Sequence, residues 1–128
     1  ERIAELDKLG MEAFAKHHVP RSCSPDARPE VVAKGIEITA AMNQTGYVRQ
    51  FRSLRHANIH EWTAKVRVPA MIVSGEHDKT AGKKMVREIA EAMPGIRHHE
   101  IPGIGHMIYL EYPERFNALL EELLAEAG

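Results

Sequence analysis

The chain has 128 residues, of which 44% are apolar, and its 17 basic side chains nearly balance 18 acidic ones. This length is enough for one folded domain, and the lack of a charged block argues against nucleic acid or an anionic membrane surface as a partner. No apolar run approaches the roughly 20 residues that cross a bilayer, and the single Cys23 is typical of a reducing compartment, so we expect a cytoplasmic protein that binds a small-molecule substrate or ligand.

The first half of the sequence is predicted to be helical. Apolar residues recur at helical spacing over residues 2–16, 30–42 and 47–57. The sequence His17-His18-Val19-Pro20 is expected to end the first helix, and Pro29 precedes the second. The chain opens with Glu1 rather than Met, already inside a helical pattern, so we expect residues upstream of it in the native protein.

The second half has a different pattern. Residues 70–73 are a continuous apolar run that ends at Ser74-Gly75, as expected of a parallel strand covered on both faces. A helix is predicted over 82–93, a second strand over 96–101, and a last amphipathic helix from Pro113 onward. The predicted order is therefore strand, helix, strand, helix.

Two polar side chains follow the two predicted strands. Strands joined by a helix within about thirty residues are expected to be parallel neighbours, and their carboxyl ends then share one edge of the sheet. Asp78 comes just after the first strand and His106 just after the second. A carboxylate beside an imidazole fixes the ring tautomer and stabilises the imidazolium, so this pair is the candidate catalytic site. The alternative for Asp78 is an ordinary turn aspartate.

Two segments carry a family resemblance. Residues 68–78 end in Ser74-Gly75-Glu76-His77-Asp78 and resemble the acid-bearing strand and turn of α/β-hydrolases. Residues 101–107, which include Gly103-Ile104-Gly105-His106, together with Tyr112-Pro113-Glu114, resemble the histidine loop of that family. The acid precedes the histidine, as it does in the family. The first half resembles the helical cap that enol-lactonase-like and esterase-like branches insert before the acid-bearing strand.

The resemblance implies a partial α/β-hydrolase fold of the α/β class. The cap-like region is expected over residues 1–65 and the C-terminal part of the core over 66–128, with two parallel strands. The complete enzyme is expected to hydrolyse an ester, a lactone or a related small substrate through a serine acyl-enzyme, without a cofactor. Asp78 and His106 are then the acid and the histidine of the triad.

The nucleophile of the family is not found in this sequence. It belongs in a Gly-x-Ser-x-Gly elbow, and no serine of the chain stands in that motif. The serines are Ser22, Ser24, Ser53 and Ser74. We therefore expect the isolated chain to be inactive. The alternative is a non-catalytic ligand-binding or oligomeric interaction module derived from a hydrolase.

The predicted sheet is also incomplete, because the strand over 70–73 leaves one edge without a partner. We expect this edge to be covered in a homodimer or by a missing N-terminal half of the hydrolase. Two further residues are candidates for the substrate pocket. They are Met107, which could instead fill the core, and Trp62, which could instead anchor the cap.

Histidines outside the candidate site are not expected to bind a metal ion. His56 and His60 are four residues apart, but no third ligand with suitable spacing accompanies them. The adjacent pairs at 17–18 and 98–99 are expected to lie at the surface or to pack against the cap. The sequence thus predicts no metal site.

Overall fold

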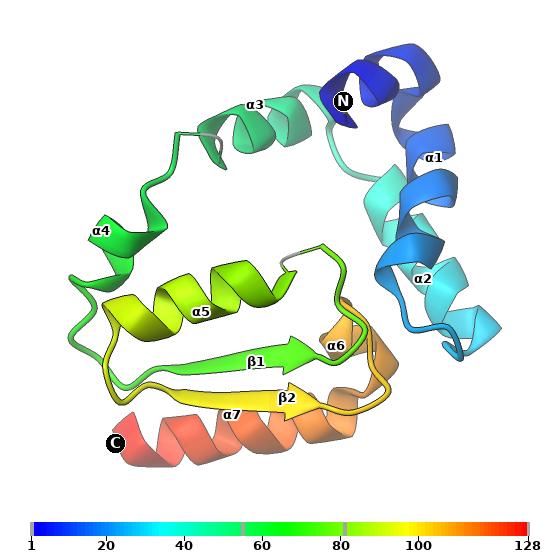
Figure 1. Ribbon diagram of the computed structural model, residues 1–128. Coiled ribbons are helices and arrows are strands. Elements are labelled where there is room, and N and C mark those ends of the chain that lie inside the picture. The colour runs from blue at the N-terminus through cyan, green and yellow to red at the C-terminus, as the bar shows by residue number, and fades with distance from the viewer. Residues whose placement is uncertain (1, 55, 81, 128) are drawn as a thin grey trace. The chain divides into compact units, whose positions relative to one another are not determined.

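The computed structural model describes residues 2–54, 56–80 and 82–127. Its elements are α1 (Arg2–Ser22), α2 (Pro29–Ala40), α3 (Gln44–Leu54), α4 (Ile59–Thr63), β1 (Met71–Gly75), α5 (Gly82–Ala92), β2 (Arg97–Ile101), α6 (Ile108–Glu111) and α7 (Pro113–Ala127) (Figure 1). They form two compact units, the first made of residues up to Arg21 and Arg28–Ala57, the second of Ser22–Ala27 and residues from Asn58 onward. Among the described residues, no helix is long and apolar enough to cross a membrane.

The first unit is helical and contains its own apolar core. Leu6, Met11 and Phe14 of α1 are buried together, and Tyr47 and Val48 of α3 pack against them. The rings of Phe14 and Tyr47 meet edge to face, with centroids 5.5 Å apart, a geometry that the aromatic quadrupole favours. The apolar spacing seen in the sequence therefore corresponds to a buried stripe along α1.

The predicted end of the first helix is wrong. Helix α1 continues through Pro20 to Ser22, and its irregularity lies at Gly10, where φ is 75° and ψ is 167°. A proline has a helical φ and removes one backbone donor, so a helix can pass through it close to its last turn. Gly10 adopts a backbone conformation that a residue with a Cβ atom avoids, and this is where the helical path is broken.

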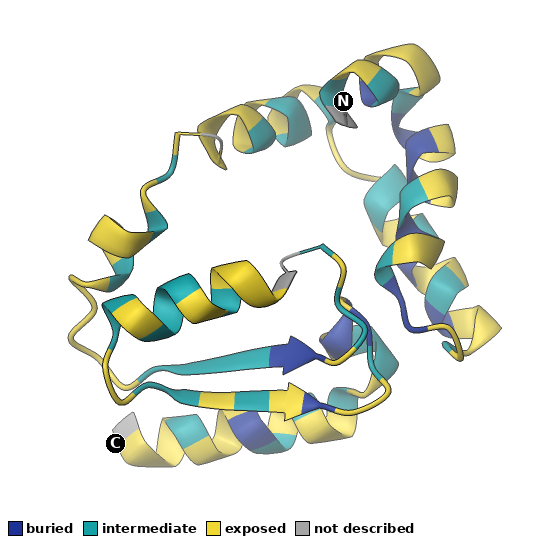
Figure 2. Cartoon of the chain, in the orientation of Figure 1, coloured by how far each residue is buried: buried dark blue, intermediate teal, exposed yellow. Residues whose placement is uncertain are grey.

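The second unit is built on a two-stranded parallel sheet. Strand β1 pairs with β2 in the register Met71 to Arg97 through Gly75 to Ile101, and α5 connects the two strands. The predicted α/β class, the parallel pair and the strand–helix–strand–helix order are thereby confirmed. Figure 2 shows that the carboxyl ends of both strands are the buried ends, at Ser74-Gly75 and at Ile101.

The two faces of this sheet are covered by different helices (Figure 1). On one face, Ile101 and Leu119 of α7 are buried together with Ile108, and Met71 and Val73 pack against them. On the other face, Ser74, His98 and Glu100 lie with Val86 and Ala90 of α5. The alternation of side chains along each strand thus separates an apolar face under α7 from a more polar face under α5.

Two short helices were not predicted. Helix α4 has five residues and α6 has four, which is too short for a helical period to show in a sequence. The side chain of Asn58 caps α4 by accepting a 3.1 Å hydrogen bond from the Glu61 amide. Helix α3 ends at Leu54 rather than at residue 57, so His56 and His60 do not share a helix. The expected cap and core boundary, at residues 65 and 66, stays a prediction.

Candidate active site

The candidate acid lies in a tight turn directly after β1. The Asp78 amide donates to the Gly75 carbonyl oxygen at 3.0 Å, which closes the turn. One carboxylate oxygen, Asp78 Oδ1, accepts a 2.7 Å hydrogen bond from the Thr80 amide. An aspartate that bonds to the backbone two residues later holds both the turn and its own side chain in one orientation.

The acid turn is joined to the loop that follows β2 by backbone hydrogen bonds. The Glu76 amide donates to the Ile101 carbonyl oxygen at 3.0 Å, and the His77 amide donates to that of Ile104 at 2.9 Å. The Glu76 carboxylate accepts a 2.8 Å hydrogen bond from the Gly103 amide. The pairing of the two chain segments therefore extends beyond the strands and brings the two loops into register.

The imidazole and the carboxylate meet between these loops. His106 Nδ1 lies 2.9 Å from Asp78 Oδ2. The predicted proximity of the two side chains is confirmed. An ionised carboxylate only accepts hydrogen bonds, so Nδ1 carries the proton and Nε2 is left as the basic nitrogen. The Asp78 side chain is 9% exposed whereas that of His106 is 43% exposed, so the ring can receive a proton from a reactant while its orienting carboxylate stays buried.

Two glycines allow the loops to come this close. A Cβ atom on Gly75 would lie 2.2 Å from the Gly105 carbonyl oxygen and 2.4 Å from that of Ile104. A Cβ atom on Gly105 would lie 2.5 Å from the backbone of Cys23 and Ser24. These neighbours are backbone atoms that cannot rotate away, so both positions require glycine for steric reasons.

A segment distant in sequence completes the histidine loop. The His106 amide donates to the Ser22 carbonyl oxygen at 2.7 Å. The Glu111 carboxylate accepts hydrogen bonds from the Ser24 amide, at 2.9 Å, and from the Gly105 amide, at 3.1 Å. Glu111 therefore connects Ser22–Ala27 to the loop that carries the imidazole.

Sequence reasoning missed Ser22, Thr80 and Glu111 as parts of this site. Thr80 bonds to the acid through its amide, and its hydroxyl lies 3.5 Å from that of Ser22. Their partners are up to 87 positions away, and no local pattern marks such contacts. The one available signal was Asp78 itself, because an aspartate in a turn accepts a hydrogen bond from the backbone amide two residues later.

Cys23 is a buried thiol beside the histidine loop. Its Sγ lies 3.9 Å from the sulfur of Met107, which is buried as well. Burial, together with the negative charge of Glu111, raises the pKa of Cys23 to about 11. The thiol is therefore protonated at neutral pH and is not an activated nucleophile, since the thiolate is the reactive form.

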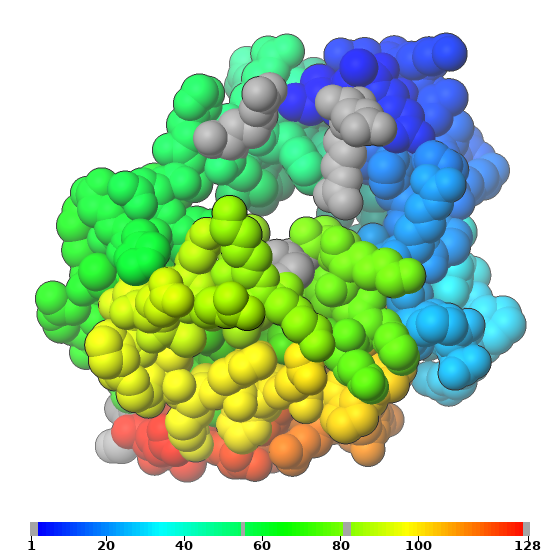
Figure 3. Space-filling view, viewed as in Figure 1, coloured from blue at the N-terminus to red at the C-terminus, as the bar shows by residue number. Residues whose placement is uncertain are grey.

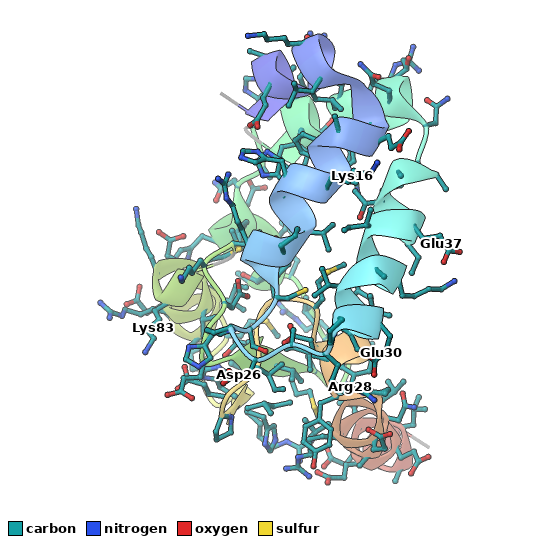
Figure 4. The ribbon with its side chains drawn as sticks, turned by 90° about the vertical axis from the view of Figure 1, so that its right-hand side faces the viewer. Lys16, Asp26, Arg28, Glu30, Glu37 and Lys83 are labelled. Carbon is teal, nitrogen blue, oxygen red and sulfur yellow. The ribbon has the colours of Figure 1, made fainter. Side chains whose placement is uncertain are left out.

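A pocket of about 250 Å³ adjoins the acid on the α5 face of the sheet. Its polar lining consists of Ser74, Asp78, Lys83, Arg87, His98 and Glu100. Ser74 Oγ lies 2.8 Å from His98 Nε2, so this serine is engaged within the lining. Side chains of α5 project from the surface in the space-filling view (Figure 3), and Lys83 of that helix is labelled in Figure 4.

The two predicted pocket residues lie elsewhere. Trp62 is on α4 with 57% of its surface exposed, and Met107 is buried against Cys23. Neither is among the residues that line the pocket beside Asp78. Their role in binding a substrate stays a prediction.

Comparison with known proteins identifies the family. The model of the alpha/beta hydrolase fold matches residues 12–113 of this chain, more than half of its length. The chain belongs to the α/β-hydrolase fold family. This α/β-hydrolase chain is 33% identical over 78 residues to the human protein named serine hydrolase BPHL, a match that covers 60% of the chain and 27% of the relative.

Solved structures agree with this assignment. The enol-lactonase from Burkholderia xenovorans LB400 matches with a TM-score of 0.84 and 26% identity, over 97% of this α/β-hydrolase chain and 48% of the enzyme. A thermophilic esterase from Thermogutta terrifontis matches with a TM-score of 0.82 and 19% identity, over 98% of the chain and 48% of that protein, which shows the fold. The chain thus spans about half the length of these structures and about a quarter of its human relative.

Replacing Gly105 by alanine is expected to destabilise the chain. The added methyl group would overlap backbone atoms of Cys23 and Ser24, and overpacking of this kind costs about 1–3 kcal/mol of unfolding free energy. Urea unfolding followed by circular dichroism measures the change. Gly46→Ala is the matched control, because its Cβ would meet Asn43 Oδ1 at an ordinary 3.5 Å in α3, so stability should hold or rise. Equal stability of the two variants would contradict the steric role of Gly105.

Cys23 is expected to react slowly with a thiol reagent in the folded chain. Its raised pKa of about 11 keeps the thiol neutral at pH 8, and burial blocks the reagent. A chromogenic disulfide reagent at pH 8 should therefore label the native chain at least about tenfold more slowly than the chain in urea, where the pKa returns toward about 8.5. Comparable rates before and after unfolding would show that the thiol is accessible and ionised.

Proposed function

We propose that this chain supplies the acid and the base of a serine hydrolase that acts on an ester, a lactone or a related small substrate. The observation that carries the proposal is the 2.9 Å hydrogen bond that His106 Nδ1, on a half-exposed ring, donates to Oδ2 of the buried Asp78 carboxylate. The substrate class is supported by the likeness to the enol-lactonase of Burkholderia xenovorans and to the human serine hydrolase. The helices of the first unit would serve as the cap over the substrate.

In this proposal His106 acts as a general base and then as a general acid. Its Nε2 takes the proton of a serine hydroxyl as the oxygen attacks the substrate carbonyl, and it returns that proton to the leaving group. Asp78 keeps the proton on Nδ1 and stabilises the imidazolium that forms. Water, activated by the same nitrogen, then releases the acyl group.

The proposed nucleophile comes from outside these 128 residues. The printed sequence contains no Gly-x-Ser-x-Gly motif, and Ser74 is 8% exposed and already bonded to His98. A general base accelerates ester hydrolysis only when a nucleophile is positioned for deprotonation and hydrogen-bond donors stabilise the oxyanion. We therefore propose that the chain by itself is inactive and that activity requires a segment carrying the nucleophile.

The unpaired edge of β1 is the proposed place for that segment. In the described residues β1 pairs only with β2, so one row of its backbone donors and acceptors has no strand partner. A strand from an N-terminal hydrolase half would pair there, and in its absence two copies of this chain would cover the edges in a homodimer.

A second candidate function is ligand binding without catalysis. It is favoured by the 250 Å³ pocket, whose lining brings Lys83, Arg87 and His98 together with Glu100. Side chains of both charges suit a polar small molecule. Ligand binding requires no nucleophile. It differs from the first proposal in predicting no ester hydrolysis even when an N-terminal hydrolase half is supplied.

The activity of the proposed dyad is expected to appear only when a nucleophile is supplied. The purified chain should not increase the rate at which an activated aryl ester hydrolyses in buffer alone. Coexpressed with an N-terminal α/β-hydrolase half that carries Gly-x-Ser-x-Gly, it should turn the ester over, and Asp78→Asn should lower kcat by roughly 10⁴-fold because the ring adopts the wrong tautomer. Initial rates with a chromogenic ester measure both effects.

Asp26→Asn is the matched control for that experiment, because Asp26 is an exposed aspartate (Figure 4) outside the dyad. It should retain the rate of the parent complex. Equal rates for Asp78→Asn and Asp26→Asn would contradict the proposed catalytic role of Asp78. Turnover by the isolated chain that is lost in His106→Ala would contradict its proposed inactivity.

Self-association is expected when the chain is purified alone. Sedimentation velocity over a concentration series should show a dimer, because pairing of two β1 edges satisfies backbone groups that otherwise face water. Replacing Val73 with proline removes a backbone donor at the unpaired edge, because the Glu76 amide donates to Ile101 of β2 and amides alternate in direction along a strand, and it should shift the equilibrium toward monomer. A folded parent chain that stays monomeric at all concentrations would contradict the homodimer.

A further inference from the structure

Three metal-ligating side chains converge on α1, away from the proposed dyad. Glu5 Oε2 lies 2.9 Å from His18 Nε2, and Glu5 Oε1 contacts His17 Nδ1. One ligand atom from each residue lies within 4.8 Å of the other two. Two imidazole nitrogens and a carboxylate are therefore already gathered in a volume that one ion could fill.

The break at Gly10 explains how these residues meet. Glu5 precedes His17 and His18 by 12 and 13 positions, which in a continuous helix would separate them by about 18–20 Å along the axis. The positive φ of 75° at Gly10 interrupts α1 between them, so the first helical segment no longer continues the axis of the second. The histidine pair, expected to lie at the surface or to pack against the cap, thereby acquires a carboxylate partner.

The surroundings hold the cluster and still admit an ion. The His18 ring packs on Phe14 with centroids 4.2 Å apart, and its side chain is 19% exposed. The side chains of Glu5 and His17 are 26% and 42% exposed, so one side of the cluster faces water.

We propose that Glu5, His17 and His18 bind one divalent transition-metal ion, of which Zn²⁺ has the most suitable chemistry. Zinc is bound by imidazole nitrogen and carboxylate oxygen at about 2.0–2.2 Å, and water can take the fourth position of its tetrahedron. Donor atoms in such a site lie roughly 3.3 Å apart, a separation between the short contacts that Glu5 makes with the two histidines and the 4.8 Å within which all three ligand atoms lie. Imidazole donors disfavour Mg²⁺ and Ca²⁺, which require oxygen ligands.

One neighbouring cation opposes the ion. Arg21 Nη1 lies 3.3 Å from His17 Nδ1 and competes for the lone pair that the metal uses. Arg21 is exposed, so it can swing into water when the ion binds. Lys16 (Figure 4), one residue before the pair, is instead engaged by Glu12 at 2.6 Å, and both of these side chains are exposed. Removal of the Arg21 guanidinium should therefore strengthen binding.

The test is calorimetric titration of the 128-residue chain with zinc chloride, with Co²⁺ absorption in the visible as a second readout of coordination. We expect one ion per chain, and at least about tenfold weaker binding in Glu5→Gln, His17→Gln and His18→Gln, since loss of even an outer partner of a ligand costs 10–100-fold. Arg21→Ala should bind more tightly. Circular dichroism verifies that each variant is folded, and the exposed His17 is the substitution that least disturbs packing.

Matched controls separate this site from other histidines. His60→Gln and His106→Ala should bind zinc as the parent does, because neither residue is among the three proposed ligands. Absence of binding by the parent chain would overturn the proposal. So would unchanged affinity in His17→Gln and Glu5→Gln, or loss of binding confined to a control variant.

Discussion

The close approach of two backbone turns is the constraint on which the candidate site depends. Gly75 and Gly105 have no side chain, and the carbonyl oxygens of Ile104 and Gly105 occupy the space that a Cβ atom on Gly75 would take. Only then can the amides of Glu76 and His77 reach their acceptors in the following loop. The hydrogen bond between His106 and Asp78 follows from this backbone packing. The chemistry of the pair is set by side chains, but their spacing is set by the main chain.

Much of this arrangement could be predicted because its signals are local. A short apolar run ending at Ser74-Gly75 indicated a buried strand, and the helix after it required a parallel neighbour. Those two inferences place Asp78 and His106 at one edge of the sheet before any coordinates are known. The family motifs around both residues pointed in the same direction. Local pattern and topology were therefore sufficient for the dyad.

The support of the dyad could not be predicted in the same way. Glu111 bonds to the amides of Ser24 and Gly105, and the first of these is 87 positions away. Nothing in the sequence around Ser22–Ala27 indicates that this segment lies with the residues after Asn58. In α1 the break was predicted at His17-His18-Val19-Pro20, and the structure has it at Gly10. Proline has a helical φ, so the chain can keep its helical path through Pro20 although one backbone hydrogen bond is lost, whereas a positive φ changes the direction of the chain.

The bracing of the acid turn has a thermodynamic consequence for any enzyme assembled from this chain. Asp78 accepts from Thr80, its turn is bonded to the histidine loop, and that loop is bonded to Ser22 and Glu111. The imidazole and carboxylate are thus ordered before a reactant or a partner arrives, and their rotational freedom has already been lost during folding. Binding of a nucleophile-bearing segment then requires less loss of side-chain conformational entropy. The net binding free energy is therefore more favourable than it would be if the two side chains were ordered only on binding.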